Sequence, residues 1–232
     1  MRAVVAESDS RVEVLGRLAA LLGGRAHQRT LRVAIDGMDA AGKTTLSDEL
    51  ARTLRQSGVP VLRASIDGFH YPASVRHRRA EEQPARGYYE DSFDYPALRR
   101  LLLDPLGRSG EHGVRTRVFD FRSDRPIDQE PEPVQPGSVL LFDGVFLLRP
   151  ELDGCWDLSI FLRVDPAISL ERALRRDIPL FGTREATERL YRERYLPGQA
   201  LYLSLVRPEQ RAEVLIDNNN PAAPKFLRIP QA

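Results

Sequence analysis

Residues 37–44 read Gly-Met-Asp-Ala-Ala-Gly-Lys-Thr and match the pattern G-x-x-x-x-G-K-T, which is typical of a phosphate-binding loop. In such a loop the backbone N–H groups turn inward around the β- and γ-phosphates of a nucleotide, and Gly37 and Gly42 allow the turns. Lys43 is predicted to bridge those phosphates, and the hydroxyl of Thr44 is predicted to hold Mg²⁺. The sequence therefore predicts a site for ATP and Mg²⁺, with nucleotide contacts from Gly37, Asp39, Ala40, Ala41, Gly42, Lys43, Thr44 and Thr45.

This loop stands between a strand pattern and a helix pattern. Leu31, Val33 and Ile35 form a short apolar run before it, and Leu46 and Leu50 follow it with helical spacing. A helix that begins at the loop aims the positive end of its dipole at the phosphates. The alternative is a glycine-rich turn before an ordinary helix, which four fixed positions in the right structural context disfavour.

Lysine is rare in this chain. Lys43 and Lys225 are the only lysines, so the other 32 of the 34 basic residues are arginine. Because the chain uses arginine by default, a lysine in the loop indicates a position that needs a compact point charge instead of a wide planar guanidinium.

Two carboxylates follow apolar strand patterns. Val61–Ile66 is a predicted strand that leads into Asp67, and Val139–Phe142 is a second that leads into Asp143. An acidic residue at the carboxyl end of a strand stands where open α/β sheets bind their ligands. Asp143 is predicted to hold Mg²⁺ together with Thr44, as the acid of a Walker B pattern. Asp67 is predicted to orient or deprotonate an acceptor hydroxyl.

Three arginines lie at helical spacing after Asp165, where a helix is predicted to begin at the following proline. Arg172, Arg175 and Arg176 occupy positions i, i+3 and i+4, which share one helical face, so the three cations could converge on one anion. We expect this face to close as a lid over the phosphates, with Arg172 and Arg176 in catalysis and Arg175 in nucleotide binding. The arginine bias of the chain weakens the cluster as a signal.

Phosphoryl transfer and nucleotide hydrolysis are the two reactions that such a site could perform. A GTPase normally carries an N-K-x-D motif, and neither lysine lies in one. Many ATPases place a glutamate directly after the Walker B aspartate to activate water, whereas this chain has Gly144. Transfer to a hydroxyl of a small molecule is therefore favoured, and a nucleotide-hydrolysing regulatory ATPase is the alternative.

Strands alternate with helices along the chain, which predicts an α/β fold of three layers with a central, mostly parallel sheet, as in P-loop NTPases. Tyr71–Ser92 shows no periodic apolar pattern and is predicted to be a long loop, either functional or simply solvated. The other predicted elements are helices within 8–22, from Asp94 through Leu102, from Gly182 to Tyr195 and from Leu201 to Val206, and strands at 114–123, Leu158–Val164 and Val214–Ile216.

The composition is that of a water-soluble globular protein. The 232 residues suffice for one domain, with 42% apolar and 29% charged residues and a net charge of +1. This charge gives no electrostatic reason to expect nucleic acid or a membrane as a partner. We expect a cytoplasmic protein, because the sequence shows neither an apolar run of about 20 residues nor a signal peptide. The single cysteine, Cys155, excludes an internal disulfide, and a homo-oligomer stays open.

Taken together, five stretches resemble the uridine kinase branch of the P-loop kinases, which also includes phosphoribulokinase and bacterial pantothenate kinase. The stretches are the phosphate loop, DGFH at 67–70, RVFDFRSDR at 117–125, LLFDGVFLL at 140–148 and RALRRD at 172–177. The resemblance implies that Asp67 is the catalytic aspartate and that Asp94 holds ribose hydroxyls, although a helix N-cap is the simpler interpretation of Asp94. It also implies that residues 172–176 form the lid.

Three positions depart from the pattern of that group. The Walker B acid is Asp143 where uridine kinases often have glutamate, which is a mild change. Phe119 and Asp124 stand where a base-contacting tyrosine and histidine are expected, so groups that would read uracil are missing. His70 could enter the acceptor pocket or be merely structural. The predicted acceptor contacts are Asp67, His70, Asp94, Phe119 and Asp124.

The resemblance covers most of residues 30–218, and the predicted elements fit a single P-loop kinase domain over residues 1–232. Within it we expect an N-terminal helical extension at 1–29, an acceptor-binding insertion at 71–137 and a lid at 172–195. The predicted activity is transfer of the γ-phosphoryl group of ATP to a hydroxyl of a small molecule, namely uridine or a related nucleoside. A sugar-like or pantothenate-like acceptor is the alternative.

Overall fold

The computed structural model describes residues 10–26, 29–79, 81–107 and 113–230. Six strands form one sheet in the order β2-β5-β1-β6-β7-β8, and all neighbours are parallel except β8, which runs antiparallel to β7. The strands predicted from the apolar runs are therefore confirmed. They are β1 (Leu31–Gly37), β2 (Val61–Ser65), β5 (Val139–Gly144), β6 (Leu158–Arg163) and β7 (Val214–Asp217), whereas β8 (Lys225–Arg228) was not predicted.

The register of this sheet brings the predicted carboxylates to one edge. Ile35 of β1 pairs with Asp143 of β5, and Asp143 in turn pairs with Ser65 of β2. The phosphate loop leaves β1 two residues after Ile35, and Asp67 comes two residues after Ser65. The carboxyl ends of the three strands thus meet, as expected for a ligand site in a parallel sheet.

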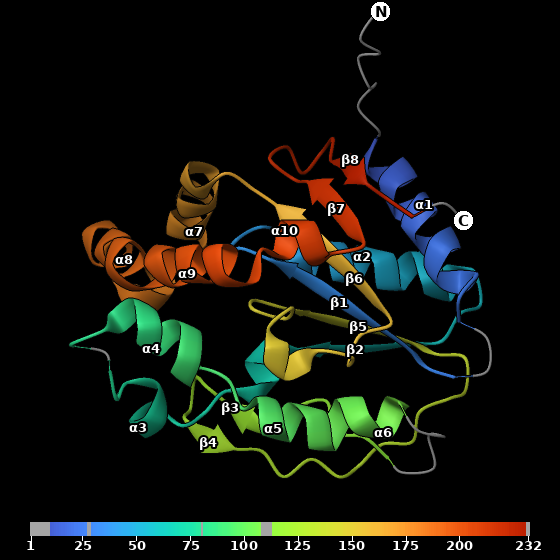
Figure 1. Cartoon of the computed structure of the whole chain (residues 1–232), viewed down its shortest axis with the longest axis horizontal. Helices are drawn as coiled ribbons and strands as arrows, with labels where there is room; N and C mark the ends of the chain where they lie inside the picture. The colour runs from blue at the N-terminus through green and yellow to red at the C-terminus, as the bar shows by residue number, and fades with distance from the viewer. Residues whose placement is uncertain (1–9, 27–28, 80, 108–112, 231–232) are drawn as a thin grey trace, which may run out of the picture.

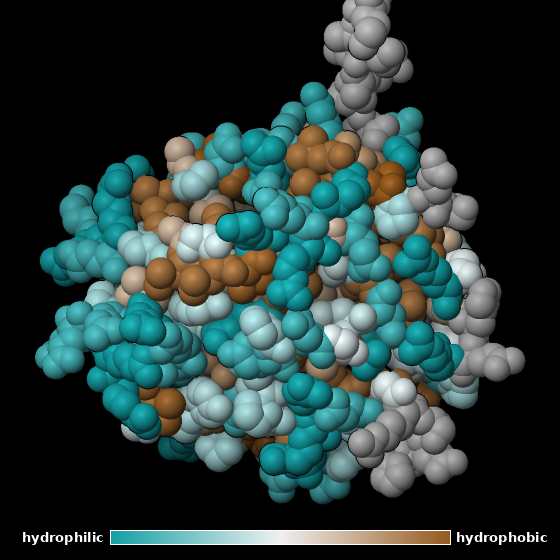
Figure 2. All heavy atoms as spheres, viewed as in Figure 1, coloured by the Kyte–Doolittle hydropathy of each residue, from teal (hydrophilic) through white to brown (hydrophobic). Residues whose placement is uncertain are grey.

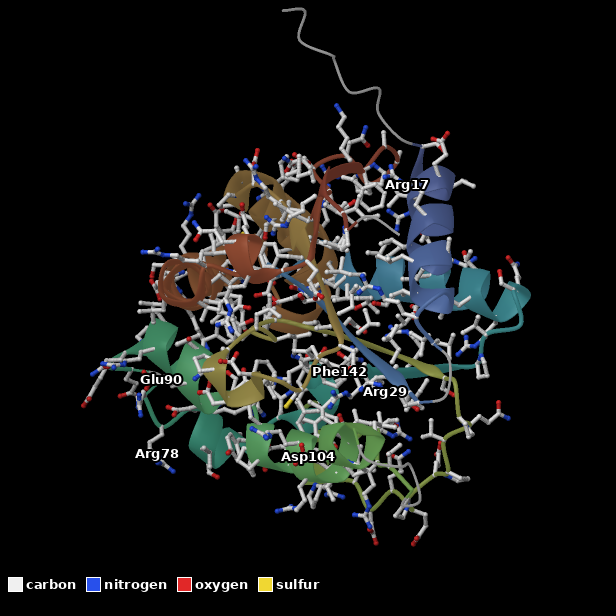
Figure 3. The ribbon with its side chains drawn as sticks, turned by 45° about the vertical axis from the view of Figure 1, so that its right-hand side comes forward. Arg17, Arg29, Arg78, Glu90, Asp104 and Phe142 are labelled. Atoms are coloured by element: carbon white, nitrogen blue, oxygen red, sulfur yellow. The ribbon has the colours of Figure 1, made fainter. Side chains whose placement is uncertain are left out.

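Alternate side chains of the central strands pack on opposite faces, which gives the three predicted layers. Val33 and Ile35 pack in one hydrophobic cluster with α1 (Arg11–Gly23) and α2 (Lys43–Gln56). Phe142 belongs to the cluster on the other face, and Figure 3 shows it in the interior of the molecule. The helices of that face are α4 (Pro84–Asp91), α5 (Tyr95–Leu98) and α9 (Leu196–Val206).

Helices α7 (Pro166–Phe181), α8 (Arg184–Leu190) and α9 lie beside α4 at one end of the sheet (Figure 1). The predicted helices of this region are confirmed, but the last one begins at Leu196, five residues earlier than Leu201. Pro197 lies in its first turn, where the missing N–H leaves no helical bond unmade. The other elements here are a π-helical turn (Tyr191–Tyr195) and α10 (Pro208–Arg211).

The prediction of a long loop at Tyr71–Ser92 is wrong. This segment contains α3 (Ala73–Arg76) and α4, in which Pro84 occupies the first turn. Helix α4 has eight residues and buries Tyr88 and Tyr89. Two turns are too short for a helical period to become visible among the surrounding polar residues.

The predicted strand at 114–123 shrinks to β3 (Phe119–Asp120), which pairs with β4 (Arg125–Pro126). The side-chain carbonyl of Gln129 accepts hydrogen bonds from the backbone N–H groups of Thr116 and Arg117, at 2.9 and 3.1 Å. A side chain therefore takes the place of a partner strand. The helix predicted from Asp94 is confirmed and runs through α5, a π-helical turn (Arg99–Leu103) and α6 (Asp104–Gly107), with short 3₁₀ turns elsewhere at Ile66–Phe69 and Pro150–Leu152.

The helix predicted within 8–22 is α1. Ser10 caps its start and exchanges hydrogen bonds with Glu13, as in a capping box. No helix within the described ranges is both long and apolar enough to cross a membrane. Figure 2 shows polar residues over much of one face, with an apolar strip over α9, where Leu205 is exposed.

Candidate active site

The phosphate loop joins β1, which ends at Gly37, to α2, which begins at Lys43. A Cβ on Gly37 would lie 2.7 Å from the carbonyl oxygen of Leu162, so the loop needs glycine there. Gly42 has a φ of 92°, in the left-handed region that favours glycine. Asn218, just after β7, donates from Nδ2 to the carbonyl of Ala41 at 2.7 Å and ties the loop to the sheet.

Lys43 lies buried at the centre of the loop. Its Nζ donates to the backbone carbonyls of Gly37 and Met38, at 3.0 and 2.6 Å. Burial lowers the pKa of Lys43, while the nearby carboxylates of Asp39 and Asp36 act in the opposite direction. The ammonium group is thus held inside the loop by two backbone carbonyls.

A cavity of about 690 Å³ borders the loop and is called here the nucleotide-side cavity. The predicted contacts Ala40, Gly42, Lys43, Thr44 and Thr45 line it. Other walls come from α1, α2, α7 and the connection after β7, through Arg11, Glu49, Arg172, Arg176, Asn218, Pro221 and Ala222.

A second cavity, of about 450 Å³, also borders the loop and is called here the acceptor-side cavity. Its carboxylates are Asp39, Asp67, Asp143 and Asp177, its cations are Lys43, Arg122 and Arg176, and its aromatic walls include His70, Tyr88, Phe93, Phe121, Phe181, Tyr191 and Tyr195. Lys43, Thr44 and Arg176 line both cavities. The two cavities therefore meet at the residues that are predicted to handle the transferred phosphate.

The residues Thr44 and Asp143 fit a Mg²⁺ ion. The Thr44 hydroxyl donates to Asp143 Oδ2 at 2.7 Å, and Arg63 donates to Asp143 Oδ1 at 2.8 Å, which orients the carboxylate. Mg²⁺ in phosphoryl-transfer sites is bound by one or two protein oxygens, with waters and substrate phosphates completing the shell. A hydroxyl and an adjacent carboxylate form such a pair.

Asp67 stands in the 3₁₀ turn after β2, where the hydroxyl of Ser65 accepts a hydrogen bond from its backbone N–H at 3.3 Å. The residue is exposed, but the atoms of the cavity walls around its carboxylate partly desolvate it. This desolvation raises the pKa of Asp67, and the charge of Asp143 adds to the rise, while Lys43 and Arg176 oppose it. A carboxylate with a raised pKa is a better proton acceptor than an ordinary aspartate.

His70 forms part of the aromatic wall. Its ring lies 4.6 Å from that of Phe93 and 4.9 Å from that of Phe121, and Nδ1 donates to the carbonyl of Asp67 at 3.1 Å. Burial lowers the pKa of His70 to about 4. The imidazole is therefore neutral at neutral pH and offers Nε2 as an acceptor.

The three lid arginines do not converge as predicted. Arg172 and Arg176 line the nucleotide-side cavity, but Arg175 is 74% exposed and pairs with Glu171. Successive residues are rotated by 100° around a helix, so positions i+3 and i+4 lie on opposite sides of position i. Arg176 is held by Asp177, with Nε 2.6 Å from Oδ1, and Arg172 donates to the carbonyl of Asn219 at 2.7 Å.

Three predicted acceptor contacts do not line the cavity. Asp94 accepts from the backbone N–H of Ala97 at 2.9 Å as the N-cap of α5, and Phe119 is buried in β3. Asp124 adopts a left-handed conformation and accepts from the backbone N–H of Ala73 at 2.8 Å and from Arg76 at 3.0 Å, so it fastens α3. Phe121 and Arg122 line the cavity in place of Phe119 and Asp124.

Several contributors to the site belong to no motif. Arg63 orients Asp143, and Arg11 pairs with Glu49 at 2.5 Å at the rim of the nucleotide-side cavity. These contacts join parts of the chain that are far apart in sequence, so no local sequence pattern predicts them. Asn218 is different, because it follows a predicted strand just as Asp143 does, and that signal could have identified it.

Asp36, the residue before the loop, is fully buried. It accepts hydrogen bonds from the backbone N–H groups of Gly37 and Leu147, at 2.7 and 3.2 Å, and from the hydroxyl of Tyr202. Burial raises the pKa of Asp36 to about 6, although all three hydrogen bonds act in the opposite direction.

This raised pKa predicts that stability falls as the pH rises from about 4 to about 6. The ordinary pKa is 3.8, so between 3.8 and about 6 the folded protein binds the proton more tightly than the unfolded chain. The free energy of unfolding then decreases with pH, by about 3 kcal/mol over the interval. Urea unfolding of the parent and of Asp36→Asn measures this, because the difference in pH dependence isolates Asp36. Parallel curves for the two proteins would contradict the assignment.

The chain is similar to known proteins over most of its length. A model of the phosphoribulokinase/uridine kinase family matches residues 33–196. The uridine kinase of Leuconostoc citreum (strain KM20) is 28% identical over 188 residues, which cover 79% of this chain and 84% of the relative. The uridine kinase of Deinococcus deserti is 30% identical over 207 residues, which cover 84% of this chain and 93% of the relative.

Solved structures of similar proteins share the fold. A possible uridine kinase from Bacillus stearothermophilus superposes with a TM-score of 0.69 at 21% identity, covering 87% of this chain and 96% of that one. A candidate fructose transport system kinase from Silicibacter sp. TM1040 superposes with a TM-score of 0.65 at 27% identity, covering 81% and 94%. Since the family model spans more than half of its residues, the chain belongs to the phosphoribulokinase/uridine kinase family.

Proposed function

We propose that the protein is an ATP-dependent kinase that transfers the γ-phosphoryl group to a hydroxyl of uridine or a related nucleoside. One observation carries the proposal: the nucleotide-side and acceptor-side cavities meet at Lys43, Thr44 and Arg176. A phosphoryl group bound there is within reach of an acceptor in the second cavity. The membership of the family and the uridine kinases among the relatives support the reaction class.

In this proposal each charged group has one task. Asp67 accepts the proton of the attacking hydroxyl, for which its raised pKa suits it. Lys43 and Arg176 stabilise the charge that spreads over the transferred phosphoryl oxygens, and Arg172 binds the donor phosphates. Thr44 and Asp143 hold Mg²⁺, which neutralises phosphate charge when it is bound. Lys43 and Arg176 are held in advance by their hydrogen bonds, so little reorganisation is needed.

The segments around the cavities have corresponding roles. Residues 71–137 contribute Tyr88, Phe93 and Phe121 to the acceptor side and form the acceptor-binding insertion. Residues 172–195 contribute to both sides and form the lid. The N-terminal extension adds Arg11 of α1 to the rim of the nucleotide side.

The acceptor side offers aromatic surfaces for stacking, and the two positions expected to read a base in the family pattern, Phe119 and Asp124, do not line it. Phe121 and His70 are suited to stack on a ring, whereas Asp124, which could contact a base if the family pattern held, faces Arg76 and the backbone of Ala73 instead. Such a site discriminates between bases only weakly, by about 1–3 kcal/mol. A sugar acceptor is the second candidate, because one of the similar structures is a candidate fructose transport system kinase.

The specificity constants of a panel of acceptors test this proposal. The panel is uridine, cytidine, purine nucleosides, free hexoses and pentoses, pantothenate and ribulose 5-phosphate. We expect a neutral hydroxyl compound to be the best acceptor, with pyrimidine nucleosides within about 200-fold of purine nucleosides. A preference for uridine over the other nucleosides by several orders of magnitude would contradict the expected weak discrimination between bases. A phosphorylated sugar as the best acceptor would contradict the assignment of this carboxylate-rich cavity to neutral hydroxyls.

A further inference from the structure

Asp39 is the third residue of the phosphate loop, yet its side chain does not serve the nucleotide side. It lines the acceptor-side cavity, and within the described residues it is not among those that line the nucleotide-side cavity. The neighbouring residue Ala40 shows the opposite behaviour and lines only the nucleotide side. One carboxylate of the phosphate loop thus lines the acceptor-side cavity.

This carboxylate is held through one of its two oxygens. Oδ2 accepts a hydrogen bond from the hydroxyl of Tyr88 at 2.9 Å and a second from the side-chain amide of Gln199. No residue that the structure describes donates to Oδ1, and none forms an ion pair with Asp39. The hydroxyl of Ser169 in α7 also donates to the backbone carbonyl of Asp39, at 2.6 Å. Asp39 is therefore fixed in place while Oδ1 keeps its capacity to accept.

The donors to Asp39 are themselves rigidly placed. The ring of Tyr88 lies edge-on to those of Phe146 and Tyr195, with centroids 5.1 and 4.8 Å away. Helix α9, which carries Gln199, approaches α4 so closely that a Cβ on Gly198 would lie 2.8 Å from the ring of Tyr88. The geometry around Asp39 is thus set by packing and not by flexible side chains.

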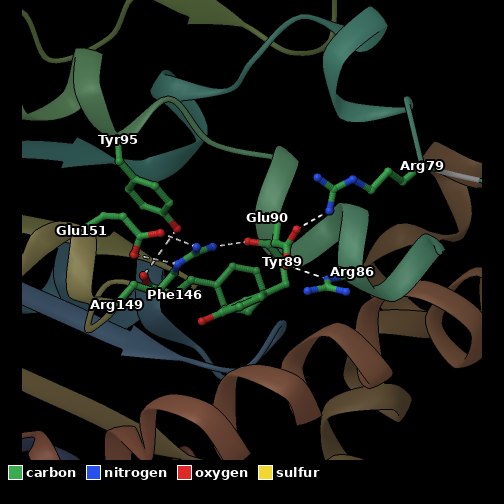
Figure 4. A network of polar contacts seen from close by, with 8 residues as sticks. All are labelled: Arg79, Arg86, Tyr89, Glu90, Tyr95, Phe146, Arg149 and Glu151. Atoms are coloured by element: carbon green, nitrogen blue, oxygen red, sulfur yellow. Dashed lines mark hydrogen bonds and ion pairs between the residues drawn. The ribbon is translucent and has the colours of Figure 1, made fainter.

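A network of polar contacts fixes α4 from its other side (Figure 4). Arg149 donates to the carbonyl of Tyr89, lies 4.1 Å from the centre of its ring and pairs with Glu151. On the outer face Glu90 pairs with Arg79, which precedes α4 in the chain, and with Arg86 of the same helix (Figure 4). Tyr88 is therefore presented to the loop by a helix that is anchored at both faces.

The other carboxylates of the cavity have tasks or partners of their own. Asp143 contacts Thr44 and Arg63, and Asp177 is bound by Arg176 and by the hydroxyl of Tyr191, which lies 2.5 Å away. Asp67 is the proposed base. Asp39 alone combines a fixed position with a free acceptor atom and no assigned task, and an anionic carboxylate favours a neutral hydroxyl over a phosphate or a carboxylate.

We propose that Asp39 is a specificity-determining residue of the acceptor site, whose Oδ1 accepts a hydrogen bond from an acceptor hydroxyl other than the one that is phosphorylated. The inference rests on the proposed kinase function and defines its substrate class as neutral compounds with at least two hydroxyls, such as ribosides or free sugars. Asp39 then takes the role that the family resemblance gives to Asp94, which caps α5.

Kinetics of Asp39→Asn test this inference. The variant keeps an oxygen for Tyr88 and Gln199 but presents an amide donor to the cavity in place of an acceptor. We expect the KM for the best acceptor of the panel to rise about 10- to 100-fold, because the variant loses a hydrogen bond to a charged group. The dissociation constant of a fluorescent ATP analogue should stay within about twofold of the parent. Asp128→Asn, at a side chain that is 89% exposed, is the matched control.

Acceptors that lack single hydroxyls separate recognition from a structural effect. For the parent protein, an acceptor that lacks the hydroxyl in contact with Asp39 should also have a KM about 10- to 100-fold higher than the complete acceptor. For Asp39→Asn, the KM values of these two acceptors should be nearly equal. Tyr88→Phe keeps the ring and its packing, and we expect it to raise KM for the complete acceptor about 3- to 10-fold, as loss of a neutral hydrogen-bond donor does.

Three results would overturn this inference without refuting the proposed function. They are an active Asp39→Asn protein with an unchanged acceptor KM, a tenfold or greater loss of nucleotide affinity in Asp39→Asn, or a larger rise of the acceptor KM in Asp94→Asn than in Asp39→Asn. The nucleotide measurement needs no acceptor, so it tests Asp39 in every case. A parent protein that binds the nucleotide but phosphorylates no acceptor of the panel would instead refute the proposed function.

Discussion

Asp67→Asn is expected to lower kcat by about 10² or more while the affinity for ATP stays near that of the parent. The substitution keeps the shape of the side chain but removes the proton acceptor from the acceptor-side cavity. Asp67 is suited to this role because it stands at the carboxyl end of β2, lines the cavity and has a raised pKa. Steady-state kinetics with the best acceptor, together with titration of a fluorescent ATP analogue, give both quantities.

Asp128→Asn is the control for this prediction as well, because it makes the same chemical change at an exposed carboxylate outside the site. Thermal unfolding of both variants shows whether the fold is retained. Equal turnover of Asp67→Asn and the parent would mean that Asp67 only terminates a strand. A large loss of ATP affinity would mean that its role is binding and not proton transfer.

Lys43→Ala is expected to lower kcat/KM by about 10² to 10³, the second large effect. The ammonium group is buried in the loop and lies where the two cavities meet, so its loss removes a fixed charge from the transferred phosphoryl group. Lys43→Arg should stay nearly as inactive, because a planar guanidinium does not fit where a compact charge is held between two carbonyls. Coupled measurement of ADP formation with a saturating acceptor gives these rates.

The chain itself offers the matched control for this change. Lys225 is the other lysine, and it is exposed on β8. Lys225→Ala should behave like the parent. Normal turnover of a folded Lys43→Ala protein would refute the assignment of the loop to nucleotide phosphates.

The parts of the site that lie within one strand-loop unit could be predicted from the sequence. Each of Lys43, Asp67 and Asp143 follows an apolar run that forms a strand of the sheet, and parallel pairing brings the ends of these strands together. Local pattern and tertiary arrangement agree there, because the strand register follows from burial on both faces.

The parts that depend on contacts across the chain could not be predicted. Tyr88 donates to Asp39 from 49 positions away and Gln199 from 160, so neither local pattern contains the contact. The exposure of Arg175 could not be predicted, because helical spacing fixes the angles between side chains around the axis but not which side of the helix faces the cavity. The contact between Asp124 and α3 could not be predicted either, because it depends on a left-handed backbone conformation at Asp124.

The fate of the γ-phosphate of ATP distinguishes a kinase from a nucleotide hydrolase. ATP labelled in the γ-position is incubated with the protein, Mg²⁺ and each acceptor of the panel, and the label is followed into phosphorylated acceptor and into free phosphate. We expect the label to appear in a phosphorylated hydroxyl compound in equal amount to the ADP formed, with little free phosphate in the absence of acceptor. Release of free phosphate at the same rate with and without every acceptor would contradict it and would identify a nucleotide hydrolase.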